Sequence, residues 1–291
     1  MVPLKDNNPT SRFPFVTVGL IVACFIVFFW QLNFPTNHRL SEAGFGPVDQ
    51  SSLEYGAIPY RITHPNVGDC DIGAVAEFAP GEFQAGVVCP GTKQYREAVA
   101  RSRENPGADL GPITIDQKPW YVTLFTSMFM HGGWLHILGN MLFLWVFGNN
   151  IEDRFGPVKF LLFYLLAGLI AVYTQALIDP SSTAPTIGAS GAIAGVLGAY
   201  AVLFPRARVL TLIFIVFFVT LVEIPALILL ALWFILQFVP ALGQVAVGSG
   251  GDQGVAYFAH VGGFAFGVAV AAALLQVTRR RAPPEPRLPV Y

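Results

Sequence analysis

Six apolar segments, separated by polar or glycine- and proline-rich links, dominate this chain. A helix needs about 20 apolar residues to cross a hydrocarbon core of about 30 Å. Only 12% of the 291 residues are charged, about half of the roughly 25% that soluble domains carry. The sequence therefore predicts an all-α polytopic membrane protein, whose apolar segments are residues 15–32, 134–147, 160–178, 187–204, 209–239 and 255–277.

Basic residues decide how often the fifth segment crosses, because Lys and Arg gather on the cytoplasmic side of membrane proteins. A single crossing places both chain ends on the same side as the links after spans two and four. The opposite short links, 179–186 and 240–254, then carry no Lys or Arg. A double crossing would move Arg279, Arg280 and Arg281 to that opposite side. We therefore predict six spans, cytoplasmic termini and a bacterial plasma membrane; the cytoplasmic side then carries Lys5, Arg12, Arg154, Lys159, Arg206, Arg208, Arg279, Arg280, Arg281 and Arg287.

The first part of the fifth segment needs a separate place, since residues 209–239 exceed the length of one span. We expect residues 209–222 to lie along the cytoplasmic interface or to dip into it. Glu223 and Pro225 interrupt the segment. Because a charge deep in the bilayer is costly, we interpret Glu223 as an interfacial carboxylate at the foot of the fifth span rather than as a functional intramembrane acid.

A long polar segment separates the first span from the second. It contains 11 Asp or Glu and 6 Lys or Arg, and it is predicted to be an extracytoplasmic insertion. Its many Gly and Pro residues indicate mostly irregular structure, apart from a short amphipathic helix at Lys93–Glu104. The predicted organisation is a cytoplasmic N-terminus (1–14), a first span (15–32), the insertion (33–117), a core of spans two to six (118–277) and a basic, proline-rich cytoplasmic tail (278–291).

Two of the three cysteines, Cys70 and Cys89, fall in the insertion. On the oxidising side of a cell membrane, a disulfide between them is favoured over free thiols. Cys24 lies in the first span and is expected to be an inert apolar filler. The chain has no nucleotide-binding glycine loop and no basic tract of the kind that nucleic acid attracts, so we expect lipid and other membrane proteins as partners.

Polar side chains inside the spans need a reason, because they are costly in lipid. His136 and Asn140 are four residues apart, so they share one face of the second span. Asn140 and, in the sixth span, His260 each come about six residues after entry from the outside, roughly 9 Å deep. Ser190 begins the fourth span and reaches that depth only if the preceding link dips into the protein. These side chains are then expected to meet in the outer leaflet.

Small residues provide a way for the helices to approach each other. Ser190, Ala194 and Gly198 form one small stripe, and Gly263 and Gly267 form another beside His260. Small residues four apart allow transmembrane helices to pack closely. A close crossing would bring the Ser190 hydroxyl within hydrogen-bonding distance of the His260 ring. The glycines assigned to helix packing are Gly188, Gly191, Gly198, Gly263 and Gly267.

A serine beside a histidine predicts nucleophilic catalysis. The His260 imidazole would take the Ser190 hydroxyl proton as the oxygen attacks a carbonyl, then return that proton to the leaving amine. The developing oxyanion needs fixed donors, and the Ser190 backbone N–H, the Asn140 amide and the His136 ring are available. No carboxylate is expected at this depth, so the sequence favours a dyad over a triad.

Taken together, these motifs resemble those of the rhomboid family of intramembrane serine proteases, over roughly residues 118–275. The resemblance implies a six-helix bundle with a long insertion, a Ser190–His260 dyad and an oxyanion site at His136 and Asn140. It also implies cleavage of transmembrane segments of other proteins near the outer face, without cofactor or metal. The motifs are His131-x4-His136-x3-Asn140, Gly188-Ala189-Ser190-Gly191 and Ala259-His260-x2-Gly263-x3-Gly267, with Glu152-Asp153-Arg154-Phe155-Gly156 and Leu232-Trp233-Phe234-x2-Gln237 in support.

The chain departs from the family pattern at two places. Some members carry an aromatic residue four positions after the serine, which stacks on the catalytic histidine, whereas this chain has Ala194. Support for His260 must then come from elsewhere or be weaker. The insertion is much longer than in compact bacterial relatives, and the resemblance gives residues 36–117 no role.

Two other functions remain open at this stage. A rhomboid-like protein that binds membrane proteins without cutting them would share most of these motifs. A transporter or metal site would use His131, His136 and His260, since three imidazoles can bind zinc. However, the chain has no H-E-x-x-H motif and no obvious acid to orient such ligands. For His131 we expect a structural role, a hydrogen bond that holds the insertion.

Overall fold

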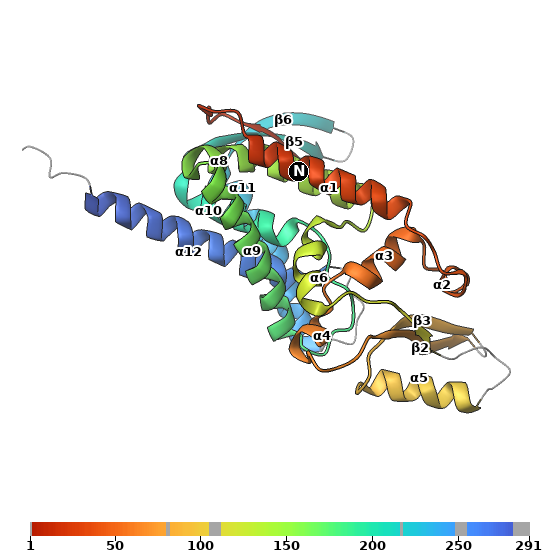
Figure 1. Cartoon of the computed structure of the whole chain (residues 1–291). Helices are drawn as coiled ribbons and strands as arrows, with labels where there is room; N and C mark the ends of the chain where they lie inside the picture. Colours follow the sequence, from red (N-terminus) through yellow and green to blue (C-terminus); the bar gives the residue numbers. More distant parts are fainter. Residues whose placement is uncertain (1, 80–81, 105–111, 216–217, 248–254, 282–291) are drawn as a thin grey trace, which may run out of the picture.

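A computed structural model describes residues 2–79, 82–104, 112–215, 218–247 and 255–281; the last part of the predicted tail, 282–291, lies outside the described residues. The chain forms a helical bundle with a small β-sheet at each of two separate places (Figure 1). We call the end near β1 (Val2–Asp6) the N-terminal end. The main bundle helices are α1 (Phe15–Leu32), α7 (Trp134–Phe143), α9 (Pro157–Ile178), α10 (Ser190–Leu203), α11 (Ala226–Val247) and α12 (Tyr257–Arg281).

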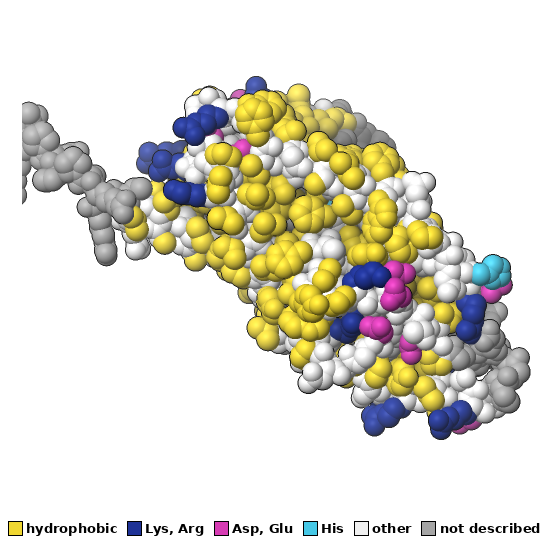
Figure 2. Space-filling view, in the orientation of Figure 1, with side chains coloured by type: hydrophobic (Ala, Val, Ile, Leu, Met, Phe, Trp, Pro, Cys, Tyr) yellow, Lys and Arg dark blue, Asp and Glu magenta, His cyan; other side chains and the backbone are white. Residues whose placement is uncertain are grey.

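Three of these helices are long and apolar enough to cross a membrane, within the described part of the chain: Phe15–Leu32, Pro157–Ile178 and Tyr257–Val277. Two shorter apolar helices are Ser190–Leu203 and Ala226–Leu242. Helix α7 runs through a π-helical turn, Leu144–Gly148, into α8 (Asn149–Phe155). Figure 2 shows hydrophobic side chains spread over the bundle, with charges gathered toward its ends. The protein is therefore a membrane protein, while the count of six spans stays a prediction.

Helix α10 forms the centre of the bundle because its small residues let two neighbours approach. All residues from Gly191 to Ala201 are buried. A Cβ at Gly263 or Gly267 in α12 would meet the backbone carbonyl oxygen of Gly191 or Gly195, respectively. On the other side, a Cβ at Gly191 or Gly195 would meet alanines of α9. The predicted close crossing of spans four and six is therefore present.

Gly188 does not belong to this crossing, contrary to the sequence interpretation. Helix α10 begins at Ser190, so Gly188 lies in the link before it, with a φ of 122°. Residues other than glycine rarely adopt a positive φ of this size. The glycine is needed for the path of the link.

The prediction of an all-α fold is wrong at the N-terminal end. Residues expected to lie along the interface form the hairpin β5 (Arg208–Ile215) and β6 (Phe218–Pro225), which pairs with β1 (Val2–Asp6) in the order β1-β5-β6. A continuous apolar run does not distinguish a strand from a helix. Glu223 lies on β6, exposed, with its carboxylate 3.9 Å from the Arg208 guanidinium.

Asp6 joins this sheet to the bundle. Its carboxylate is buried and accepts hydrogen bonds from the Asn150 amide, at 2.7 Å, and from the Tyr200 hydroxyl, at 2.5 Å. Asn150 belongs to α8 and Tyr200 to α10, so the Asp6 side chain connects β1 to both helices by hydrogen bonds.

The insertion is more regular than its composition predicts. It contains a sheet in the order β3-β2-β4, whose long strands pair as an antiparallel hairpin. The prediction of mostly irregular structure is therefore wrong. The helix predicted at Lys93–Glu104 is present with these bounds. Its elements are α2 (His38–Glu42), α3 (Pro47–Tyr55), α4 (Pro59–Thr63), β2 (Asp71–Ala79), β3 (Glu82–Val88), α5 (Lys93–Glu104) and β4 (Ile113–Thr114), and α6 (Trp120–Thr126) follows.

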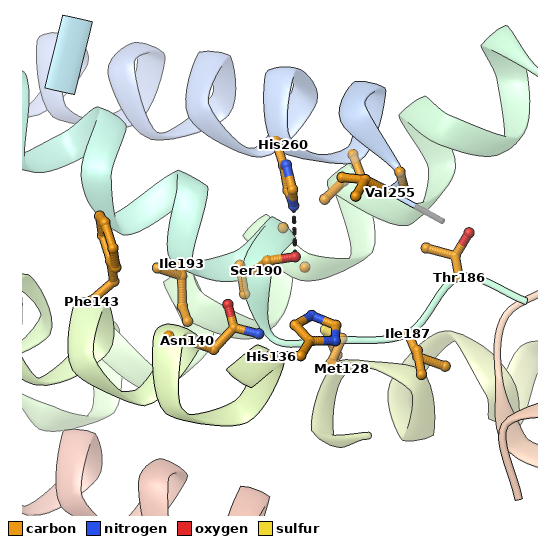
Figure 3. Close-up of a pocket in the computed structure, with 18 of the residues that line it drawn as sticks. Met128, His136, Asn140, Phe143, Thr186, Ile187, Ser190, Ile193, Val255 and His260 are labelled. Carbon is orange, nitrogen blue, oxygen red and sulfur yellow. Dashed lines mark hydrogen bonds between the residues drawn. The ribbon is translucent and has the colours of Figure 1, made fainter. Parts of the chain in front are cut away.

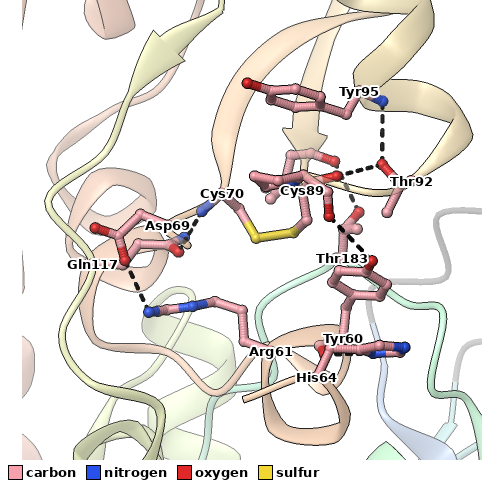
Figure 4. The surroundings of a disulfide bond; sticks show 12 residues. Tyr60, Arg61, His64, Asp69, Cys70, Cys89, Thr92, Tyr95, Gln117 and Thr183 are labelled. Carbon is pink, nitrogen blue, oxygen red and sulfur yellow. Dashed lines mark hydrogen bonds and ion pairs between the residues drawn. A yellow bond between two sulfur atoms is a disulfide. The ribbon is translucent and has the colours of Figure 1, made fainter. Parts of the chain in front are cut away.

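A disulfide closes the open end of the β2–β3 hairpin. It joins Cys70, just before β2, to Cys89, just after β3, and both residues are fully buried (Figure 4). The Cys70 backbone N–H donates to the Gln117 side-chain oxygen at 2.9 Å. This end of the hairpin is thereby fixed to the chain that leads into the bundle. Cys24 is a buried free thiol in α1, as expected.

The insertion also holds the link that precedes α10. Ala57 and Thr186 exchange two backbone hydrogen bonds, of 3.1 and 2.8 Å. The Thr183 hydroxyl donates to the Val87 carbonyl oxygen of β3 at 2.8 Å. The position of the link that ends at Ser190 therefore depends on the insertion.

Candidate functional site

A cavity of about 810 Å³ lies among α7, α10, α11, α12 and the link before α10 (Figure 3). Most of the side chains that line it are apolar, and none is Asp, Glu, Lys or Arg. Polar atoms among such apolar walls interact more strongly than they would in open water. The polar side chains that line it are Thr186, Ser190, His136, Asn140, Gln237 and His260, together with the indoles of Trp134 and Trp233.

Ser190 and His260 meet in this cavity. The Ser190 hydroxyl oxygen lies 2.7 Å from Nε2 of the His260 ring, and Figure 3 shows the two side chains pointing toward each other from α10 and α12. The close helix crossing at Gly191 and Gly263 brings their backbones together. Two side chains 70 residues apart in the sequence thus form a direct hydrogen bond, as the spacing predicts.

The path of the link places Ser190 in the cavity rather than in the helix interface. The Gly188 N–H donates to the Ser127 carbonyl oxygen at 2.8 Å. A Cβ on Gly188 would lie 2.8 Å from Nε2 of His136 and 3.6 Å from the Ser190 hydroxyl oxygen. Glycine therefore lets the chain pass between the histidine ring and the serine before α10 begins.

His136 and Asn140 lie across Ser190 from His260 (Figure 3). Nδ1 of His136 accepts a hydrogen bond from the Gly132 N–H at 3.3 Å. Its Nε2 therefore carries the ring proton and faces the space beside Ser190. The Asn140 amide nitrogen is buried and has no hydrogen-bond partner among the described residues. Both side chains thus present N–H groups at one place, together with the N–H groups of the first turn of α10, which have no partner within a helix.

Gln237 was named in the sequence only as part of a supporting motif, and its role beside His260 was missed. Its side-chain oxygen lies 2.7 Å from Nδ1 of His260, on the opposite edge of the ring from Ser190. Trp233, one turn earlier on α11, has its ring centroid 5.9 Å from that of His260. A lone amide in an apolar span was the sequence signal that could have identified this role. The sequence does not show which way that side of the helix faces, so the contact with His260 could not be inferred.

His131 does not point into the cavity with the other polar groups. It is fully buried, its backbone N–H donates to the Gln31 side-chain oxygen at 2.9 Å, and its Nδ1 lies 3.2 Å from the Phe129 carbonyl oxygen. The Gln31 amide in turn donates to the Ser51 hydroxyl of the insertion at 3.2 Å. The expected link to the insertion therefore runs through the backbone and Gln31, not through the His131 ring.

Metal ligation finds no support in this geometry. Among the residues that the structure describes, no three His, Cys, Asp or Glu side chains lie close enough to hold one ion. His131 and His136 are neighbours, with ring centroids 5.1 Å apart, while His260 is engaged by Ser190 and Gln237.

Comparison with known proteins matches this architecture to a family. The model of the rhomboid domain matches residues 118–277, which is more than half of the chain and contains every residue that lines the cavity. The chain belongs to the rhomboid family. The matched region ends where α12 leaves its apolar part and leaves out the insertion, 33–117, in agreement with the resemblance read from the motifs.

Several rhomboids are similar to parts of this chain. RHOMBOID-like protein 4 of Arabidopsis thaliana is 30% identical over 193 residues, 62% of this chain and 43% of that protein. Rhomboid protein 1, mitochondrial, of Saccharomyces cerevisiae is 35% identical over 97 residues, covering 32% and 28%. Rhomboid protease GluP of Bacillus subtilis is 40% identical over 85 residues, covering 29% and 16%. The matches thus span less than half the length of these rhomboids.

Proposed function

We propose that this rhomboid is a serine endopeptidase that hydrolyses peptide bonds in or near the transmembrane segments of other membrane proteins. The observation that carries the proposal is the 2.7 Å contact between the Ser190 hydroxyl and Nε2 of His260 inside the cavity. A hydroxyl hydrogen-bonded to an imidazole is the arrangement of an activated nucleophile. A protease among the similar rhomboids supports the same reaction class.

The reaction follows from the positions of these atoms. The Ser190 oxygen attacks the carbonyl carbon of the scissile bond while Nε2 of His260 takes its proton. The carbonyl oxygen becomes an oxyanion, which the free N–H groups of Asn140, His136 and the start of α10 stabilise. His260 then protonates the leaving amine, and an acyl group stays on Ser190. Water, deprotonated by His260, attacks this ester, and His260 then returns the proton to the Ser190 oxygen as the second product leaves.

The apolar surface of the bundle supports a substrate that arrives through the lipid. Hydrophobic side chains of α7 and α11 are exposed, among them Leu135, at 89%, which also lines the cavity, and Ile235, at 52%. A transmembrane segment loses little on moving from lipid to such a surface, because both are apolar. With the basic residues in the cytoplasm, six spans place Ser190 in the outer leaflet and the insertion outside the cell.

The proposal is tested with purified protein in lipid vesicles and a model single-span substrate. The wild type is expected to produce two fragments, and Ser190→Ala and His260→Ala are expected to abolish cleavage while unfolding at the same temperature as the wild type. Cleavage that survives in Ser190→Ala would overturn the mechanism. A folded wild type that binds the substrate in the cavity without cutting it would instead indicate a rhomboid-like binding protein.

A further inference from the structure

Gln237 is placed to control the protonation of the histidine. Its side-chain oxygen is 2.7 Å from Nδ1 of His260. An amide oxygen only accepts hydrogen bonds, so Nδ1 must carry the proton. Nε2 is then unprotonated and able to accept the proton of the Ser190 hydroxyl. The opposite tautomer would place the proton on Nε2 and remove the base.

We propose that Gln237 is a positioning residue for the reaction, which holds His260 in the tautomer and orientation that Ser190 requires. The inference rests on the proposed function. It adds Gln237 as a third residue, hydrogen-bonded to His260 on the side of the ring opposite Ser190. Gln237 touches neither the nucleophile nor the oxyanion position and acts through the His260 ring alone. In serine proteases with a triad, a carboxylate occupies this place.

The environment explains why an amide and not a carboxylate occupies this position. Around the His260 ring lie Ser190 from α10, Trp233 and Gln237 from α11, and His136 across the cavity, and no residue that lines the cavity is Asp, Glu, Lys or Arg. None of them carries a fixed charge. While His260 is neutral, an ionised carboxylate here would be buried with no cation beside it, so it would be favourable only once the imidazole is protonated. A neutral amide supplies the acceptor without that penalty.

Position 194 explains why the support comes from α11. Ala194 is fully buried, and a Cβ on Gly263 would lie 3.4 Å from its methyl group. An aromatic ring at this position would separate α10 from α12. The His260 ring is therefore held from the other side, by the Gln237 hydrogen bond at its edge and by Trp233 nearby.

Three variants of α11 test the inference. Gln237→Met keeps the length of the side chain and removes the acceptor. Gln237→Glu keeps both length and acceptor and adds a charge. Leu236→Met, a neighbouring position that is 58% exposed on the outside of α11, is the matched control. Each is measured for kcat and KM on the model substrate, for the rate of inactivation by a fluorophosphonate, and for both rates as a function of pH.

We expect Gln237→Met to lose about tenfold in kcat and in the rate of inactivation, the usual effect of one neutral hydrogen bond, with KM unchanged. Gln237→Glu should restore the hydrogen bond. Its carboxylate stabilises the protonated imidazole, so the fall in rate on acidification should begin at higher pH than in the wild type. Leu236→Met should match the wild type in every measurement.

Two results would overturn the role of Gln237. One is a Gln237→Met variant with wild-type kcat and inactivation rate. The other is a pH profile of Gln237→Glu that coincides with that of the wild type. The second result tests the role even if Gln237→Met fails to fold. Both outcomes leave the proposed function intact, because the wild type would still be inactivated. A folded wild type that never reacts with the fluorophosphonate would instead refute the proposed function itself.

Discussion

Gly263 of α12 lies against the backbone carbonyl group of Gly191 in α10, with no room for a methyl group between the two helices. This contact lies next to the Ser190–His260 pair, since Gly191 follows Ser190 and Gly263 is one turn from His260. The geometry of the site and the packing of the bundle therefore depend on the same crossing.

Gly263→Ala should lower stability and activity together. The added Cβ must push α12 away from α10, which typically costs about 1–3 kcal/mol and lengthens the Ser190–His260 hydrogen bond. The matched control is Gly19→Ala in α1, where a Cβ meets nothing within 4 Å. That change should leave cleavage unaffected and raise helix stability by about 0.5–1 kcal/mol. Thermal unfolding and cleavage rates of the two variants provide the comparison, and equal effects would contradict the crossing.

Asn140→Leu should separate function from stability. The Asn140 amide nitrogen has no partner in the described structure, so replacing it with an apolar group of similar size should not reduce the free energy of unfolding. Loss of an oxyanion donor should lower kcat about 100-fold. Asn150→Leu is the matched contrast, because Asn150 donates to Asp6. It should destabilise the protein with little change in kcat, and the reverse pattern would refute the assignment.

The disulfide should stabilise the insertion. Cys70 and Cys89 are 19 positions apart, and closing a loop of that size contributes about 3 kcal/mol when the bond constrains the unfolded chain. The double variant Cys70→Ala and Cys89→Ala should make residues 33–117 more sensitive to limited proteolysis. A reducing agent should have that effect on the wild type and none on the double variant. Equal sensitivity of all four samples would contradict the prediction.

Asp6 should make stability depend on pH. Burial raises the pKa of the Asp6 carboxyl above its usual range, although hydrogen bonds from Tyr200 and Asn150 oppose the rise. The folded state then holds the proton more tightly than the unfolded chain. The resulting stabilisation is complete below the unfolded pKa, near 3.8, and is lost as the pH rises through the folded pKa.

Asp6→Asn removes this titration. The melting temperature of the variant, relative to that of the wild type, should therefore increase from about pH 4 to about pH 7. A difference that stays constant over this range would show that the Asp6 carboxyl has the same affinity for its proton in the folded and unfolded states.

The sequence predicted the relation between Ser190 and His260 because short-range rules were sufficient. Residues three and four apart share a helix face, and small residues mark close crossings. The depth of Ser190 also required a link that dips into the protein, and Gly188, with its positive φ, provides that path.

The contact between Gln237 and His260 could not be predicted in the same way. It depends on the rotation of α11 about its own axis, which no local pattern fixes. The strands were missed for another reason. Gly and Pro counted over the whole insertion indicated irregular structure, whereas β2 and β3 pair with each other along their length. The hairpin of β5 and β6 was missed because its apolar run is continuous, and such a run does not distinguish strands from a helix.

The most direct test of the account is the identity of the atom that reacts with a serine-directed reagent. The protein in lipid vesicles is treated with a fluorophosphonate and digested, and the modified peptide is identified by mass spectrometry. We predict a single adduct on Ser190, absent after His260→Ala and after denaturation before treatment. An adduct on any other residue of the folded protein, or no adduct in a protein that cleaves its substrate, would contradict the assignment of Ser190 as the nucleophile.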